Sequence, residues 1–341
     1  MKAVDRWSIL ALARFWLALI VAVGHLAKFV DIGWLGIIAK FGSFEAILGF
    51  LLISGYSIGE SYRSKPEGFY WRRIKRIYPI YLASIVVVFF VTSPQVTPTF
   101  ALFLVANLLF LNQLFTTTSF VGPAWSLSLE VWLYALAPCL SKLRERSLAW
   151  LCVGSLAAYT AYTCGRSLFN WGFYAGLGFG LNLPTLAYMW ILGFWLSMTK
   201  NKLRVVFLIG LTMAYITMLG TAIQVVFRIK NNALAMVPSD LLDHALQGVN
   251  LFLVWLIFRF WLVSPLGKGE RSLWMSFLGD TSYPLYLLHI AVFTFLVRNS
   301  YSNAEFLLAA SVAVSAAVYL LLDVYSRRRH LRVKRTRGLV G

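Results

Sequence analysis

Residues 13–27 read ARFWLALIVAVGHLA, an apolar run that carries one arginine, Arg14, and one histidine, His25. His25 follows Arg14 by about three helical turns, so both side chains leave a helix on nearly the same face. The rise between them is about 16 Å, roughly half of the hydrocarbon core of a bilayer. Ionisable groups at such depth are costly and are functional candidates. The alternative is that each side chain reaches one membrane interface.

The composition predicts an all-α polytopic membrane protein. Of the 341 residues, 60% are hydrophobic and only 13% are charged, which no soluble domain resembles. A net charge of +18 would indicate nucleic-acid binding in a soluble protein. Here the positive-inside rule accounts for it, so the lipid bilayer and not a nucleic acid is the expected partner. The three cysteines lack metal-binding spacing, and no metal is expected.

The apolar runs predict about ten transmembrane helices. The expected spans are 7–27, 42–60, 77–91, 124–140, 148–164, 183–199, 205–223, 241–262, 277–297 and 304–325.

One further apolar stretch, 99–115, is expected to be a short or re-entrant helix on the outer side. If it does not cross, most Lys and Arg face the cytoplasm, as the positive-inside rule requires. Its Asn107, Asn112 and Gln113 suit burial against protein better than contact with lipid. Both termini are then cytoplasmic. We expect one integral membrane domain, 1–326, followed by a basic cytoplasmic tail, 327–341.

Three arginines stand directly before the third expected span. Arg72, Arg73 and Arg76 lie in the sequence FYWRRIKRIYP, and the last two are three residues apart, on one face of a helix. Guanidinium groups match phosphate oxygens in bidentate geometry, so a phosphate-rich cytosolic ligand is expected to dock here. The alternative is a topological signal alone.

A carboxylate lies inside the expected span 124–140. Trp125 is placed at the outer interface, Ser126 is placed to cap the helix, and Glu130 follows one turn further in. A buried carboxylate needs a partner. We expect Glu130 to lie beside His25 and to orient it, as carboxylates orient catalytic imidazoles. A structural pair of Glu130 with Arg14 is the alternative.

The expected span 277–297 carries Tyr283, Tyr286 and His289, spaced three apart on one drifting face. We expect these side chains, together with Trp125 and Ser126, to bind substrate or to support its site. The alternative for His289 is a hydrogen bond that joins two helices.

Taken together, these motifs resemble the membrane acyltransferase 3 family. The matching residues, in chain order, are Arg14 and His25; Ser54, Gly55 and Tyr56; Arg73, Arg76 and Pro79; Trp125, Ser126, Leu127 and Glu130; and Ser282, Tyr283, Tyr286, Leu287 and His289. Residues 141–275 match only in hydropathy, so substrate choice is expected to reside there.

The resemblance implies a multi-pass enzyme of the bacterial cytoplasmic (inner) membrane. It implies transfer of an acyl group, usually acetyl, from cytosolic acetyl-CoA or another acyl-CoA to a hydroxyl of a cell-surface polysaccharide, lipopolysaccharide or related glycan at the periplasmic side. Polysaccharide-assembly proteins are expected partners.

In this interpretation His25, Arg14 and Glu130 are catalytic, and Arg72, Arg73 and Arg76 bind the donor. Direct transfer and a covalent acyl-histidine step both fit the residues. The alternative function is a carrier or flippase for a lipid-linked sugar, which uses the same buried charges as a pathway.

Overall fold

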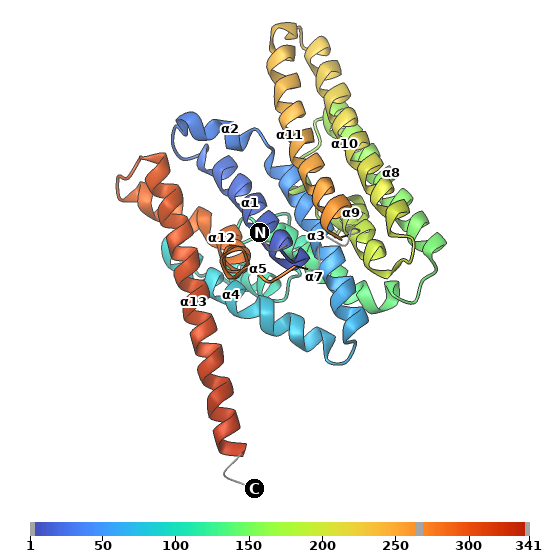
Figure 1. Cartoon of the computed structure of the whole chain (residues 1–341). Coiled ribbons are helices and arrows are strands. Elements are labelled where there is room, and N and C mark those ends of the chain that lie inside the picture. The colour runs from blue at the N-terminus through green and yellow to red at the C-terminus, as the bar shows by residue number, and fades with distance from the viewer. Residues whose placement is uncertain (1–3, 263–268, 338–341) are drawn as a thin grey trace.

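The computed structural model describes the backbone of residues 4–262 and 269–337, and the side chains of 4–260 and 269–322. The regular elements of these residues are helices (Figure 1). They are α1 (Arg6–Leu26), α2 (Gly36–Ala39), α3 (Ser43–Ser64), α4 (Phe69–Thr92), α5 (Pro98–Leu108), α6 (Asn112–Phe115), α7 (Ala124–Leu140), α8 (Glu145–Phe169), α9 (Asn182–Met198), α10 (Lys202–Lys230), α11 (Val237–Ile257), α12 (Leu273–Arg298) and α13 (Ala304–Arg337).

Local signals set where several helices begin. The side chain of Asp5 accepts a hydrogen bond from the Ser8 N–H at 2.8 Å and caps α1. Thr97 caps α5 in the same way, with Pro98 at the first helical position. Each of the ten expected spans coincides with one of the long helices, which confirms the all-helical prediction.

Six of the described helices are long and apolar enough to cross a membrane, or seven when the bent pair of residues 33–39 and 43–64 counts as one span. The six are α1, α4, α10, α11, α12 and α13. The helices α7 and α9 have 17 residues each, about 26 Å, and α9 is largely buried by its neighbours. The chain is therefore a multi-pass membrane protein, and the count of about ten spans stays a prediction, as does the orientation of the termini.

The segment 99–115 forms two short helices and not a span. α5 has 11 residues, about 17 Å, well short of a bilayer core. Phe110 adopts a positive φ of 57° and separates α5 from α6. The amide of Asn112 lies buried between Ser119 and Ser128, and Gln113 accepts from Asn182 at 2.6 Å. These polar side chains are thus buried against protein, as the sequence predicts, although Nε2 of Gln113 has no hydrogen-bond partner among the described residues.

Two helix pairs form the densest packing of the molecule: α3 with α9, and α1 with α12. At the first crossing the backbones touch. A Cβ added at Gly55 would lie 2.0 Å from the Trp190 carbonyl oxygen, and one added at Gly193 would lie 2.1 Å from that of Leu52. Small residues at such crossings are how membrane helices pack closely.

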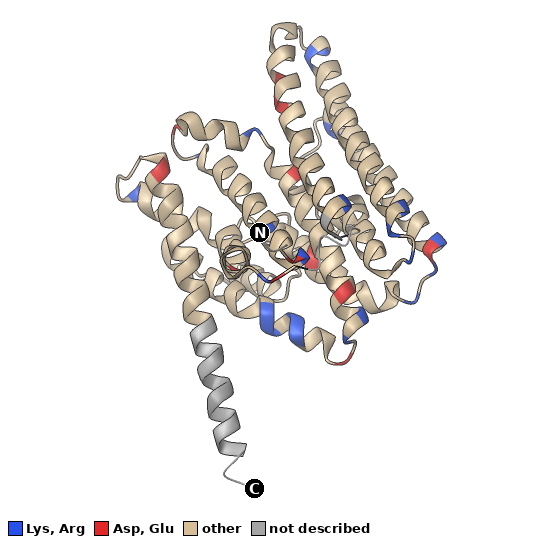
Figure 2. Ribbon diagram, in the orientation of Figure 1, with Lys and Arg blue, Asp and Glu red and all other residues tan. Residues whose placement is uncertain are grey.

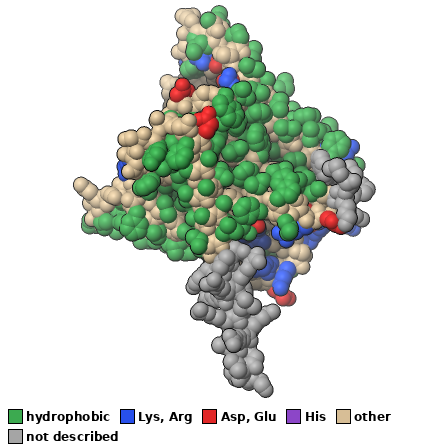
Figure 3. Space-filling model, turned by 60° about the vertical axis from the view of Figure 1, so that its left-hand side comes forward, with side chains coloured by type: hydrophobic (Ala, Val, Ile, Leu, Met, Phe, Trp, Pro, Cys, Tyr) green, Lys and Arg blue, Asp and Glu red, His purple; other side chains and the backbone are tan. Residues whose placement is uncertain are grey.

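The surface carries large apolar side chains that a soluble protein would bury. Phe90, Leu102 and Met218 are each more than 70% exposed. Apolar atoms cover the face drawn in Figure 3. Figure 2 shows Lys and Arg gathered at the N-terminal half of α4 and at neighbouring helix ends, the lower side of that view. This distribution is typical of a membrane protein.

The helices α10 and α11 form a hairpin that extends beyond the other helices at the top of Figure 1. α10 has 29 residues, about 44 Å, more than a bilayer core requires. At the opposite end of the chain, α13 runs without a break across the expected domain boundary at 326 and 327. The side chains of the expected basic tail lie outside the described residues.

Candidate active site

A cavity of about 1080 Å³ lies among α1, α3, α4, α7, α12 and α13. It brings together seven of the side chains singled out from the sequence: Arg14, Arg73, Arg76, Ser126, Glu130, Tyr283 and Tyr286. These residues are up to 272 positions apart in the chain. The cavity therefore unites most of the predicted motifs in one place.

Charges face one another across the middle of the cavity. Arg14 on α1 is half-buried, and its Nε donates to the Leu10 carbonyl at 3.3 Å. Glu130 on α7 lies within hydrogen-bonding reach of Ser54 and Tyr134, and it feels the charges of Arg14 and Arg76. Ser54 Oγ and the Tyr134 hydroxyl are themselves 3.0 Å apart. The carboxylate thus lies among hydroxyls and two guanidinium groups.

The prediction that Glu130 orients His25 is wrong. The charges that act on His25 do not include Glu130, and its ring contacts His289 instead. The helix that stands against Glu130 is α3, which supplies Ser54 as the neighbour of the carboxylate.

The three arginines of α4 separate. Arg73 and Arg76 line the cavity. Arg73 Nη2 donates to Ser61 Oγ at 2.6 Å, while its Nε is buried and has no hydrogen-bond partner among the described residues. Arg72 does not line the cavity, and it donates to the backbone carbonyls of Lys65 and Glu67 in the turn between α3 and α4. Two of the three therefore present guanidinium groups to a ligand.

Hydroxyls tie α7 and α4 to α12 at the cavity wall. The Tyr286 hydroxyl donates to the Pro123 carbonyl at 3.0 Å, and Ser126 Oγ lies 2.6 Å from it. The Tyr283 hydroxyl donates to the Ile77 carbonyl at 3.2 Å. These contacts fix the wall rather than leave hydroxyls unpaired.

The two histidines lie outside the cavity lining, one helical turn beyond Tyr286. His25 Nδ1 and His289 Nε2 are 2.8 Å apart, and the two rings are nearly parallel. His289 is fully buried and His25 is half-buried. The helix α1 therefore carries Arg14 in the cavity lining and carries His25 beyond the end of the cavity.

A family model described as an acyltransferase domain matches residues 7–322. The chain belongs to the acyltransferase 3 family. The match covers every residue that lines the cavity, so the family resemblance inferred from five motifs is confirmed.

One relative of this chain is a protein of Acidianus two-tailed virus named "Putative acetyltransferase ORF330", which is 31% identical over 134 residues. The alignment covers 38% of this chain and 37% of that protein, so the chain spans little more than a third of the relative's length. No solved structure matches the chain.

Trp125 lies beside the cavity of the acyltransferase but does not line it. Its ring packs edge-on against Phe173 at 6.1 Å, within a cluster that also holds Phe44, Tyr159 and Tyr174. Within the described residues, no group of three or more His, Cys, Asp or Glu side chains has a geometry that suits a metal ion.

Sequence reasoning missed two residues of the acyltransferase site as partners of Glu130. Tyr134 follows Glu130 by four residues, so helical spacing alone would have placed it on the same face. Ser54 comes from another helix, and only its place in the Ser54-Gly55-Tyr56 motif gave a signal.

Proposed function

We propose that this acyltransferase moves an acyl group, usually acetyl, from cytosolic acyl-CoA to a hydroxyl of a cell-surface glycan at the periplasmic side of a bacterial inner membrane. The observation that carries the donor assignment is the buried Nε of Arg73, which has no partner within the described residues. An unpaired charged donor in a cavity beside Arg76 is suited to a phosphate oxygen.

The cavity also has the size for such a donor. Its volume of about 1080 Å³ slightly exceeds the range of small-molecule and cofactor sites, roughly 300–1,000 Å³, which suits a donor as large as acyl-CoA. The phosphates of CoA bind Arg73 and Arg76, and the pantetheine arm extends past Arg14 toward His25, about 16 Å further along α1. Arg14 binds this arm and orients it. Glu130 holds Arg14 and Arg76 near each other by offsetting their repulsion.

His25 then acts as the general base. It takes the proton of the acceptor hydroxyl while the hydroxyl oxygen forms a bond to the acyl carbon. The carbon–sulfur bond breaks, and the proton passes from His25 to the leaving thiolate. The products are the ester and free CoA thiol. A half-buried histidine beyond the cavity end suits an acceptor that arrives from the side opposite to the arginines.

Charge-conserving variants of the arginines test the donor site. In Arg73→Lys and Arg76→Lys we expect the KM for acyl-CoA to rise severalfold, up to about tenfold, because a charge-assisted hydrogen bond is worth about 1.5–3 kcal/mol and Lys keeps only part of it. The turnover number should change little, since phosphate contacts hold the ground state.

Arg72→Lys is the matched control, because Arg72 carries the same group next to Arg73 but outside the cavity. Its KM should stay at the wild-type value. An unchanged KM for acyl-CoA in both Arg73→Lys and Arg76→Lys would rule out the proposed donor site. Transport of a lipid-linked sugar without consumption of acyl-CoA would instead indicate a carrier.

A further inference from the structure

The histidine pair is part of a chain of three groups that runs from α1 into α12. His25 Nδ1 lies 2.8 Å from His289 Nε2. On the other side of its ring, His289 Nδ1 lies 2.8 Å from the Leu285 carbonyl oxygen, one turn earlier on α12. Phe293 packs edge-on against the His289 ring at 5.7 Å. The buried ring of His289 is therefore held at both nitrogens and at one edge.

The Leu285 carbonyl determines where the protons of this chain lie. A carbonyl only accepts, so Nδ1 of His289 carries the hydrogen. A neutral His289 then has a lone pair on Nε2, which accepts from Nδ1 of His25. A neutral His25 with its hydrogen on Nδ1 has a lone pair on Nε2. Both rings are neutral at rest, because burial disfavours the charged form and no ion pair joins either ring to a carboxylate within residues 4–260 and 269–322.

We propose that His289 is a positioning residue that fixes the tautomer of His25 and makes Nε2 its basic nitrogen. The proposal rests on the proposed function, in which His25 is the general base. A carboxylate usually holds a catalytic imidazole in this way. Here a second imidazole, fixed by a backbone carbonyl, takes that role, and Glu130 is left to the arginines of the cavity.

The hydrogen-bonded chain of His25, His289 and the Leu285 carbonyl also stabilises the charged form of His25. When Nε2 takes the proton of the acceptor hydroxyl, His25 becomes a cation and still donates from Nδ1 to the lone pair of His289. The acyl carbon is then bonded to the acceptor oxygen, and the thiolate has left. Transfer of the Nε2 proton to that thiolate restores neutral His25 with its hydrogen on Nδ1. His289 keeps its proton on Nδ1 throughout.

Two amide variants separate the roles of the two nitrogens of His289. In His289→Gln an amide oxygen lies near the place of Nε2 and can accept from His25. In His289→Asn the amide lies near the place of Nδ1, which retains the contact with Leu285 but leaves His25 unpaired. We expect Asn to lower the turnover number about 100-fold, within the range that general-base catalysis supplies. Gln should retain more than a tenth of the activity, and both should keep the wild-type KM for acyl-CoA.

His244→Asn is the matched control. His244 Nδ1 also lies 2.8 Å from the carbonyl of the residue four positions earlier, Asp240, but it belongs to α11 and lies outside the cavity lining. This variant should keep wild-type kinetics. If the Gln and Asn variants of His289 are equally active, or equally inactive at normal abundance, the positioning role is overturned.

The tautomer itself is measurable in the wild-type enzyme, which covers the case in which the His289 variants do not accumulate. Nitrogen-15 NMR of histidine-labelled protein, with His25→Gln used to assign the signal, should give Nδ1 protonated and Nε2 unprotonated for His25. The opposite tautomer overturns the proposal. Full activity of His25→Gln would instead remove the general base of the proposed function, whereas a dead His25→Gln beside active His289→Asn removes only the positioning role.

Discussion

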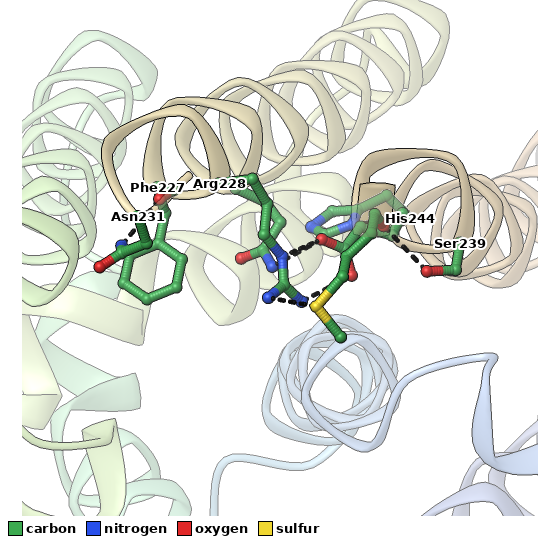
Figure 4. Close-up of polar contacts among 8 residues, drawn as sticks. Phe227, Arg228, Asn231, Ser239 and His244 are labelled. Carbon is green, nitrogen blue, oxygen red and sulfur yellow. Dashed lines mark hydrogen bonds and ion pairs between the residues drawn. The ribbon is translucent and has the colours of Figure 1, made fainter. Parts of the chain in front are cut away.

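The cavity and the tip of the α10–α11 hairpin both combine arginine with an acidic side chain, yet they treat the charges in opposite ways. At the tip, Asp240 accepts from Arg228 Nε at 2.6 Å, from Arg228 Nη2 at 3.1 Å and from Gln224 at 3.0 Å (Figure 4). The two side chains satisfy each other. Their hydrogen bonds join the end of α10 to the start of α11.

In the cavity, by contrast, no ion pair joins Arg14, Arg73 or Arg76 to a carboxylate within residues 4–260 and 269–322. Glu130 is shared between hydroxyls and two guanidinium groups. Charges that satisfy each other hold a structure together, and charges that face an open volume are available to a ligand. This difference predicts which substitutions affect catalysis and which affect only stability.

The largest effect is expected inside the cavity. Arg14→Gln should lower acyl transfer about 100-fold, because a donor arm that is displaced by about 1 Å can lose that factor in rate. Glu130→Gln should lower acyl transfer by a similar factor, because loss of the carboxylate leaves the repulsion between Arg14 and Arg76 without an opposing charge. Turnover of radiolabelled acetyl-CoA, normalised to the amount of enzyme, measures both. More than a tenth of wild-type activity in either variant would contradict the comparison.

The next effect concerns packing beneath the cavity. Gly55→Ala should reduce the folded yield severalfold and lower the Tm, because its Cβ would meet the Trp190 carbonyl and overpacking costs about 1–3 kcal/mol. Gly154→Ala on α8 is the control, since nothing lies within 4 Å of its added Cβ. Size-exclusion yield and thermal scans in detergent give the readout. Equal stability of the two variants would mean that α3 and α9 have room between them.

A smaller effect is expected at the hairpin tip. Asp240→Asn should lower the Tm by a few degrees at most, because a partly buried ion pair near the protein surface contributes little. Its turnover and KM should stay within twofold of wild type, since the pair satisfies itself and lies away from the cavity. A loss of activity comparable to that of Glu130→Gln would show that the two regions do not differ as proposed.

The smallest effect is expected from single cysteines that report topology. Placed at Thr97, Thr117 and Asn231, in a background without the native cysteines, they should leave activity unchanged and react with an impermeant reagent from one side of the membrane. A cysteine at Glu67 should react from the other side, as the charge distribution predicts. Labelling of Thr97 and Thr117 from different sides would mean that residues 99–115 cross the bilayer.

Apolar runs predicted the helices well, because lipid forces long helices wherever backbone polar groups must be satisfied internally. The cap predicted at Ser126 is wrong, because α7 begins at Ala124 and Ser126 lies inside it. The motif spacing also selected Arg14, Glu130, Ser126 and Tyr286, which meet at one cavity. Spacing fixes the face of a helix but not the helix that stands opposite. For that reason Glu130 was assigned to His25, and Ser54 was missed as its neighbour.

The partner of His25 lies 264 residues away in the chain, and the carbonyl that fixes its tautomer belongs to the backbone of Leu285. No residue type marks a backbone carbonyl. Arg72 is a second example. It stands next to Arg73 in the same basic motif, but its guanidinium donates to backbone carbonyls of the turn between α3 and α4, and nothing in the motif indicates this difference.

The contact among Tyr286, Ser126 and Pro123 has a consequence for permeability. Tyr286 and His289 differ by about 4.5 Å in height along α12, so only about one helical turn separates the end of the cavity from the histidine pair. With so short a barrier between the cavity and the histidine pair, protons and ions could leak across the membrane. The hydroxyls of this contact bond to each other and to a carbonyl at the wall of the cavity, so neither is left to hold water. We expect the same contact to limit leakage of protons and ions between turnovers.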